Sequence, residues 1–191
     1  MDILEARKIV CESGKKLVQE GLIARTWGNV SIRIDDRRMI ITPSGRKYEE
    51  LQPEDMVLVD FYTLKHDGLK PSSELKLHCE IYKTRPHIQA VIHTHQMYAS
   101  IAAAAQANIL ISDPAYQKIL GGKEIQAAPY ALPNTKGLSV GTAQAVGKSN
   151  AALMSNHGTI CIGTSMEQAF EVAHTLEKAC IQFIDSMKHP A

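Results

Sequence analysis

The sequence lacks an excess of charge of either sign, and it lacks long apolar runs. Its 191 residues include 21 Lys and Arg against 20 Asp and Glu, which gives a formal net charge of +1. This balance argues against the basic surface with which proteins bind nucleic acids or anionic membranes. No apolar stretch reaches the roughly 18 residues that a membrane-spanning helix requires. We therefore expect neither a nucleic-acid partner nor a membrane partner.

Cysteine is scarce, and the cysteines are far apart. Cys11, Cys79, Cys161 and Cys180 form no CxxC pair, and the N-terminal residues show no secretory apolar segment. These residues are therefore expected to be buried, reduced thiols in a cytoplasmic protein. The composition, 45% hydrophobic and 21% charged, is that of an ordinary globular chain. At this length it predicts a single domain over residues 1–191.

Hydrophobic periodicity predicts an α/β fold along the whole chain. Over residues 29–34 apolar and polar side chains alternate strictly, which predicts a strand with one buried face. Strands occur both in adjacent pairs and separated by helices, which favours a three-layer αβα sandwich around a mixed, mostly antiparallel sheet. Predicted helices cover residues 3–22, 71–85, 98–105, 138–148 and 165–187, and predicted strands cover residues 29–34, 38–42, 56–61, 90–95, 124–130, 151–157 and 159–162.

Two histidines stand two residues apart at the end of the predicted strand 90–95. Residues at this spacing in a strand project from the same face, so the imidazoles of His93 and His95 can converge on one cation. His157, at the end of the predicted strand 151–157, is a third candidate ligand. Three histidines with an open fourth position are typical of a catalytic zinc site. From spacing alone, histidines with a purely structural role remain an alternative.

A carboxylate, Glu74, lies in the first turn of the predicted helix 71–85. Acidic residues are favoured there because of the helix dipole alone. The functional interpretation is a carboxylate beside the metal, either a ligand or a group that moves a proton.

Several short polar segments could bind phosphate, although each also suits a turn or a helix cap. None is a Walker or Rossmann fingerprint. The pair Ser72-Ser73 is the most interesting of them, because backbone N–H groups and hydroxyls at a helix N-terminus form an anion site. The segments are Gly28-Asn29, Thr42-Pro43-Ser44-Gly45, Ser72-Ser73 and Gly121-Gly122.

Taken in order, five motifs resemble the class II aldolase/adducin family. They span nearly the whole chain, and although each is short, their order makes the set specific. The resemblance implies an αβα sandwich around a mostly antiparallel sheet, in a homotetramer whose active sites lie between subunits. The motifs are Trp27-Gly28-Asn29-Val30-Ser31-Ile32-Arg33, Thr42-Pro43-Ser44-Gly45, Pro71-Ser72-Ser73-Glu74, Ala90-Val91-Ile92-His93-Thr94-His95 and Ser155-Asn156-His157-Gly158.

The resemblance also implies a role for each motif. His93, His95 and His157 would bind Zn²⁺ or another divalent metal. Glu74 would touch this metal and act as the catalytic acid and base, and Tyr116 lies near a family tyrosine that protonates the aldehyde-side oxygen. The residues that would bind the substrate phosphate are Asn29, Ser44, Gly45, Ser72 and Ser73.

The activity that the resemblance implies is reversible cleavage of a ketose 1-phosphate, such as L-fuculose 1-phosphate, to dihydroxyacetone phosphate and a short aldehyde. Cleavage leaves a carbanion beside a carbonyl, and a Lewis acid can stabilise the resulting charge on oxygen by several kcal/mol. The fuculose-phosphate aldolases carry a C-terminal tyrosine that helps to handle the aldehyde, and this sequence has no tyrosine after Tyr130.

Other reactions on the same scaffold remain open at this point. Sugar-phosphate dehydratases, 4-epimerases and decarboxylases would use the same metal. The epimerases carry aspartate where Glu74 stands, which favours aldol cleavage over epimerisation. A non-catalytic module like the adducin head domain is the least favoured alternative, since those domains lose the metal ligands.

Overall fold

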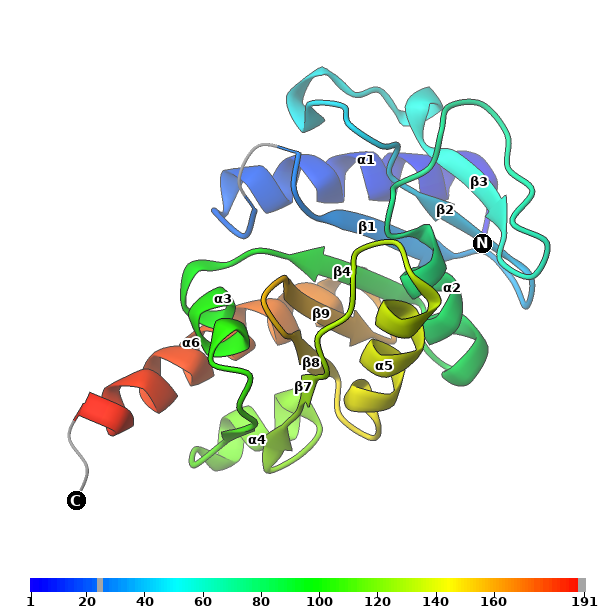
Figure 1. Cartoon of the computed structure of the whole chain (residues 1–191). Helices are drawn as coiled ribbons and strands as arrows, with labels where there is room; N and C mark the ends of the chain where they lie inside the picture. Colours follow the sequence, from blue (N-terminus) through cyan, green and yellow to red (C-terminus); the bar gives the residue numbers. More distant parts are fainter. Residues whose placement is uncertain (24–25, 189–191) are drawn as a thin grey trace.

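The fold is built around one seven-stranded sheet; a computed structural model describes residues 1–23 and 26–188. The strand order is β3-β2-β1-β4-β9-β8-β7 (Figure 1). All neighbouring strands are antiparallel except β7 and β8, which are parallel. The mixed, mostly antiparallel sheet predicted from the sequence is thus confirmed. Its strands are β1 Asn29–Arg33, β2 Arg38–Ile41, β3 Val57–Asp60, β4 Ala90–Thr94, β7 Ala127–Ala128, β8 Ala151–Met154 and β9 Gly158–Gly163.

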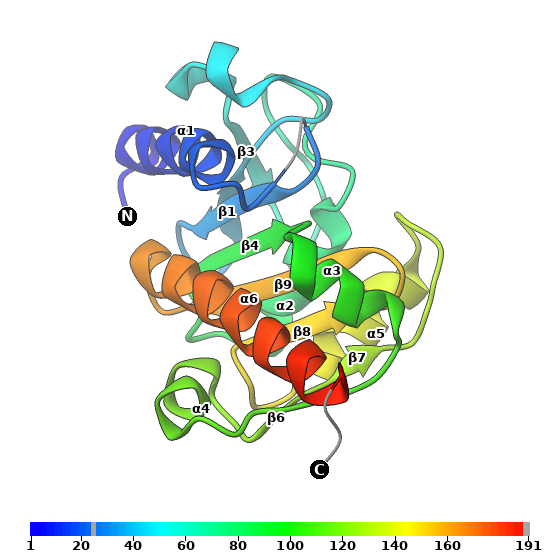
Figure 2. The ribbon, with the colours of Figure 1, turned by 90° about the vertical axis from the view of Figure 1, so that its left-hand side faces the viewer.

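Helices cover both faces of this sheet. Helices α1, α3 and α6 pack on one face and α2 and α5 on the other, and Figure 2 shows α3 and α6 in front of the sheet and α2 behind it. This confirms the three-layer αβα sandwich. No helix in the described part of the chain combines the length and apolar character needed to cross a membrane. The helices are α1 Ile3–Gln19, α2 Leu75–Thr84, α3 Met97–Ala104, α4 Pro114–Leu120, α5 Lys136–Val146 and α6 Met166–Lys188.

The remaining elements are short. The strands β5 Ile109–Leu110 and β6 Glu124–Ile125 form a separate antiparallel pair near α4. Two 3₁₀ turns, η1 Tyr48–Glu50 and η2 Pro53–Asp55, connect β2 to β3. The sequence predicted one strand over 124–130, but the structure divides this segment, because β6 pairs with β5 whereas β7 pairs with β8.

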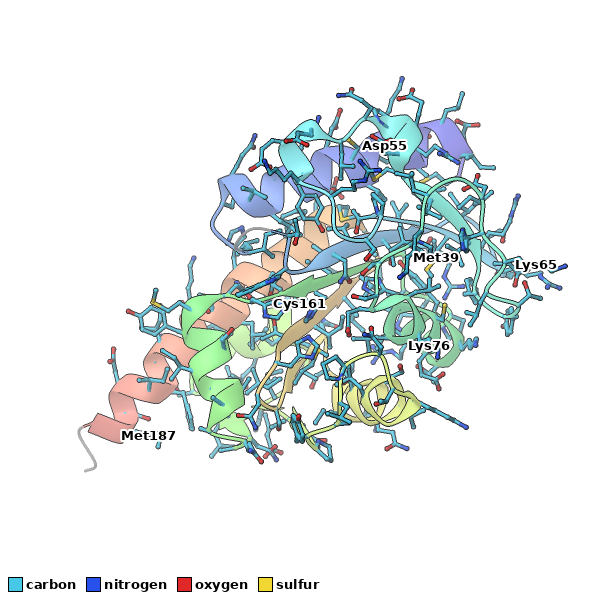
Figure 3. All side chains as sticks on the ribbon, turned by 45° about the horizontal axis from the view of Figure 1, so that its top comes forward. Met39, Asp55, Lys65, Lys76, Cys161 and Met187 are labelled. Atoms are coloured by element: carbon cyan, nitrogen blue, oxygen red, sulfur yellow. The ribbon has the colours of Figure 1, made fainter. Side chains whose placement is uncertain are left out.

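The central strands are apolar on both faces. Ile92 and Cys161 belong to the core beneath α1, α3 and α6, whereas Val91 and Ile162 belong to the core beneath α2 and α5. Cys161 marks the middle of the fold in Figure 3. Burial of a large aliphatic side chain stabilises a fold by roughly 1.5–3 kcal/mol, so these two cores hold β4 and β9 at the centre of the sheet. All four cysteines are free and buried, as predicted.

Strand β1 differs from its prediction, because both of its faces are buried. Val30 and Ile32 face the core beneath α1, as the alternation indicated. The polar residues of the other face, Asn29, Ser31 and Arg33, do not face solvent. Helix α2 covers them, and Oδ1 of Asn29, Oγ of Ser31 and the guanidinium of Arg33 form hydrogen bonds with α2 and the segment after it. Alternation was a wrong guide to exposure here because polar groups can be buried when they are hydrogen-bonded.

Helix α2 begins four residues later than the predicted helix 71–85. Its N-cap is Glu74 and its first helical residue is Leu75. Ser72 forms a turn ahead of the helix: its carbonyl accepts from the Leu75 N–H (3.1 Å) and its Oγ from the Glu74 N–H (3.2 Å). This turn leaves Ser72 and Glu74 at the same end of the sheet, beside the site described next.

Candidate active site and metal centre

Two polar loops that are distant in sequence meet at one end of the sheet. The N–H of Ser44 donates to the carbonyl of Lys70 (2.9 Å), and the N–H of Ser72 donates to the carbonyl of Thr42 (3.0 Å). These bonds join the loop after β2 to the loop before α2. As a result, two of the segments that the sequence suggested for phosphate binding form one wall of a pocket.

The candidate metal ligands come from two neighbouring strands. Asn29 on β1 lies directly opposite His93 on β4, and opposed residues of an antiparallel pair project from the same face. His95 follows β4 directly, and His157 lies in the turn between β8 and β9. Because β4 pairs with β9, with Thr94 opposite Thr159, this turn lies beside the end of β4.

The three histidines converge. Each offers a ligand atom, and these atoms all lie within 4.8 Å of one another. The Nε2 atoms of His93 and His95 are 3.0 Å apart, and the ring centroids of His93 and His157 are 5.0 Å apart. Two nitrogens bound to one ion at 2.0–2.1 Å with tetrahedral angles would be about 3.3 Å apart. The cluster is therefore close to the arrangement that a metal requires.

The protonation state of the cluster suits a metal. Nδ1 of His93 donates to the carbonyl of Thr159 (2.8 Å), which leaves the lone pair of Nε2 free to face the other rings. Burial holds the pKa of His93 well below its ordinary value, with a smaller contribution from His95 and His157. Burial also lowers the pKa of His95 to about 4 and that of His157. All three imidazoles are thus neutral at pH 7, the form that binds metals.

Two atoms in this pocket lack the partners that buried polar groups normally have. Oε2 of Glu74 and Nδ1 of His157 are buried and make no hydrogen bond within the described residues. Each such atom costs about 1–3 kcal/mol. Burial also raises the pKa of Glu74 to about 7. Three neutral nitrogens fit a divalent ion such as Zn²⁺, so the histidines fit the implied metal; Glu74 lines the same pocket but is not one of the ligand atoms that lie within 4.8 Å of one another.

Two glycines allow the backbone to approach His93 closely. A Cβ on Gly158 would lie 2.4 Å from the carbonyl oxygen of Thr94 and 3.2 Å from Cε1 of His93. Gly28 has a φ of +105°, and a Cβ there would lie 2.7 Å from the carbonyl oxygen of His93. Only glycine fits at these positions, which explains why the motifs around the histidines contain it.

The pocket has a volume of about 530 Å³. It brings together all the site residues predicted from the sequence except one. Tyr116 does not line it; this residue is half-buried on α4 and packs against the core beneath α6. The predicted residues that line the pocket are Asn29, Ser44, Gly45, Ser72, Ser73, Glu74, His93, His95 and His157.

The comparison with known families agrees with this geometry. Residues 8–184 match the model of the family described as "Class II Aldolase and Adducin N-terminal domain". The chain belongs to this family. The fold agrees with this assignment. A solved L-fuculose 1-phosphate aldolase superimposes on this aldolase-family protein with a TM-score of 0.91, at 30% identity, over 98% of this chain and 88% of that one.

Two curated relatives of this class II aldolase-family protein are sugar-phosphate aldolases. The L-fuculose phosphate aldolase of Escherichia coli (strain K12) is 34% identical over 175 residues, which are 90% of this chain and 79% of the relative. The 5-deoxy-D-ribulose 1-phosphate aldolase of Bacillus thuringiensis serovar kurstaki is 33% identical over 181 residues, which are 93% and 83% of the two chains.

Some pocket residues of this family member were given no role by sequence reasoning, although two of them, Trp27 and Asn156, stand in the motifs that indicated the family. Tyr130 and Asn134 come from the loop after β7, and Trp27 lies with its ring centroid 6.1 Å from that of His95. Asn134 and Asn156 both line the pocket with a left-handed backbone, at φ values of 65° and 56°. Asparagine tolerates this conformation better than most residues, but that preference alone also marks ordinary turns.

Proposed function

We propose that this protein is a metal-dependent aldolase that reversibly cleaves a ketose 1-phosphate of the L-fuculose 1-phosphate type to dihydroxyacetone phosphate and a short aldehyde. The observation that carries the proposal is the convergence of three neutral histidines in a pocket that is also lined by Glu74, whose Oε2 has no hydrogen-bond partner within the described residues. The two curated relatives, which are named as aldolases of L-fuculose phosphate and of 5-deoxy-D-ribulose 1-phosphate, support this substrate class.

His93, His95 and His157 would hold the ion, for which we favour Zn²⁺ because neutral imidazoles suit it; other first-row divalent ions accept the same ligands. When bound, this ion supplies Lewis acidity that spreads the charge of the developing carbanion onto oxygen. The half-buried positions of His95 and His157 leave their side of the cluster open to substrate. The buried His93 anchors the cluster to β9 through Thr159.

Glu74 is the proposed proton carrier. Its carboxyl group is buried, and with a pKa near 7 both of its protonation states are accessible at neutral pH. It would donate a proton to the carbon that becomes the dihydroxyacetone phosphate terminus during cleavage, and remove this proton during synthesis. A carboxyl group matched to the working pH in this way contributes typically 10²–10⁴-fold to a rate.

The joined loops are the proposed phosphate site. Polar groups of Asn29, Ser44, Gly45, Ser72 and Ser73 line the same pocket as the histidines. Bound phosphate would supply binding energy away from the reacting carbons and orient the substrate toward Glu74 and the metal. Exposure of Ser73 and Gly45 leaves this end of the pocket accessible to a charged group.

The proposal includes a homotetramer with active sites between subunits. Exposed apolar side chains support it: Met97 and Ile101 on α3 are 69% and 51% exposed, and Trp27 beside His95 is 55% exposed. Tyr116 could protonate the aldehyde oxygen only if a second copy brings it to this pocket. Light scattering of the native protein should therefore give four times the chain mass of 21.0 kDa; a monomer would contradict the assembly and the role of Tyr116.

The four free, buried thiols support a cytoplasmic location.

The activity is tested by incubating the purified protein with L-fuculose 1-phosphate or 5-deoxy-D-ribulose 1-phosphate and coupling the released dihydroxyacetone phosphate to a dehydrogenase. We expect release from at least one substrate, loss of release after chelation with EDTA, and recovery on addition of Zn²⁺. Chelator-resistant release would contradict the role of the metal. A metal-loaded protein that consumes either substrate without releasing dihydroxyacetone phosphate would show a dehydratase, epimerase or decarboxylase instead.

A further inference from the structure

A chain of buried polar side chains extends from the pocket into the layer between β1 and α2. His78, on the second turn of α2, is fully buried. Its Nε2 contacts Oδ1 of Asn29 (2.5 Å), and its Nδ1 lies 2.7 Å from Oγ of Ser31. Oγ of Ser31 lies 2.8 Å from the hydroxyl of Tyr82. Three of these four side chains do not reach the pocket, and only Asn29 lines it.

The chemistry of these groups determines which atom donates in each hydrogen bond of this series. An amide oxygen can only accept, so Nε2 of His78 carries the hydrogen and donates to Asn29. Nδ1 of the neutral ring must then accept, and the hydroxyl of Ser31 donates to it. Ser31 in turn accepts from the hydroxyl of Tyr82, which is closer to Ser31 than to the carbonyl of Gln89 at 3.4 Å.

The consequence for Asn29 is a fixed amide orientation. Because Oδ1 is held by His78, the NH₂ group must lie on the opposite side of the side chain. That group makes no hydrogen bond within the part of the chain that the structure describes. Asn29 is 4% exposed and lines the pocket between the histidine cluster and the serine loops. Its two N–H donors are thus available to an anion.

A purely structural role explains this arrangement less well. An apolar residue in place of His78 would pack between β1 and α2 without the cost of burying a ring with two polar nitrogens. Both nitrogens of His78 are used, one of them on the only member of the chain that reaches the pocket. The hydrogen bonds of these buried side chains therefore fix the orientation of the Asn29 amide.

We propose that His78 is a positioning residue, which holds the amide of Asn29 so that its N–H groups face the substrate phosphate. This inference rests on the proposed phosphate site. His78 itself does not touch the substrate; the hydroxyl of Ser31, which donates to Nδ1, keeps its ring in the tautomer that donates to Asn29.

The test uses inorganic phosphate as the probe, by titration calorimetry on the metal-loaded protein and again after chelation, which separates binding at the loops from binding to the metal. His78→Leu should weaken phosphate binding roughly tenfold or more, because an oriented donor to a charged group is lost. KM for the sugar phosphate should rise by a similar factor, with a smaller change in kcat and unchanged metal content. Wild-type phosphate affinity in His78→Leu would overturn the inference.

Three further variants separate positioning from folding. His78→Gln keeps an N–H that can reach Asn29 and should recover part of the affinity. Tyr82→Phe, the matched control, removes a buried hydroxyl from the same chain but leaves Ser31 to donate to His78, and should change phosphate affinity less than about twofold. Asn29→Asp keeps the oxygen that accepts from His78 but presents a second oxygen to the phosphate, and should abolish binding. Equal losses in His78→Gln, Tyr82→Phe and His78→Leu would indicate a structural role and overturn the inference.

The direction of these hydrogen bonds can be measured separately. Nitrogen-15 NMR of the imidazoles should show the hydrogen of His78 on Nε2, whereas a hydrogen on Nδ1 would reverse the chain and turn the oxygen of Asn29 toward the pocket. Failure of the proposed function is distinguishable: a wild-type protein that binds phosphate but releases no dihydroxyacetone phosphate would contradict the reaction alone. If the wild type is active and the His78→Leu variant still binds phosphate with wild-type affinity, only the inference about His78 is contradicted.

Discussion

Replacement of His95 by alanine should remove both the bound metal and the aldol cleavage. His95 is half-buried, and the hydrogen bond of its backbone N–H to the carbonyl of Leu22 (3.3 Å) does not depend on its side chain. The substitution therefore removes a ligand with little effect on packing. Changes in residues that only support metal ligands already reduce metal affinity 10–100-fold, so we expect a loss of more than about 100-fold here. His93 is a poorer choice, since its Nδ1 also bonds to Thr159.

The measurement is elemental analysis after dialysis against a defined Zn²⁺ buffer, together with release of dihydroxyacetone phosphate. His174→Ala is the matched control: this histidine lies on α6, away from the pocket, and pairs with Glu20 at 2.8 Å. It should keep metal content and activity. A His95→Ala protein that is active and free of metal would disprove the mechanism.

Replacement of Glu74 by glutamine should leave the metal in place and reduce kcat by about 10²–10⁴-fold. The amide has the same shape as the carboxyl group but cannot carry the proton between substrate and solvent. Three histidines remain to bind the ion, so metal content should stay within about twofold of the wild type. Stability should not fall, because burial disfavours the charged form of this carboxyl group.

Single-turnover kinetics and metal analysis test this prediction together. Glu80→Gln provides the control on the same helix, since Glu80 lies on α2 outside the pocket. It should retain full activity. Wild-type kcat in Glu74→Gln would exclude Glu74 as the proton carrier, and loss of metal in this variant would make it chiefly a ligand.

Much of this fold follows from local sequence patterns. The helical period of α6 and the apolar runs of β4 and β8 were predictable because each element must bury one stripe or both faces of itself. The orientation of His93 and His95 was predictable for a similar reason, since residues two apart in a strand share a face. The order of the short motifs around these residues was enough to indicate the family.

Local patterns were less informative where burial depends on a distant element. The alternation of β1 has the same appearance whether its polar face meets water or α2, and only the packing of α2 decides this. The division of residues 124–130 between two sheets depends in the same way on the positions of β5 and β8.

The sequence by itself thus determined the class of fold, the candidate ligands at the end of β4 and the list of polar segments that could bind phosphate. Only the tertiary structure decided that His157 joins the other histidines, that the loops around Ser44 and Ser72 form one wall, that Tyr116 lies outside the pocket of its own chain, and that His78 supports Asn29. The physical reason is that local periodicity reflects how one element is buried. Which strands pair, and which helix covers them, is set by contacts between residues that are far apart in the chain.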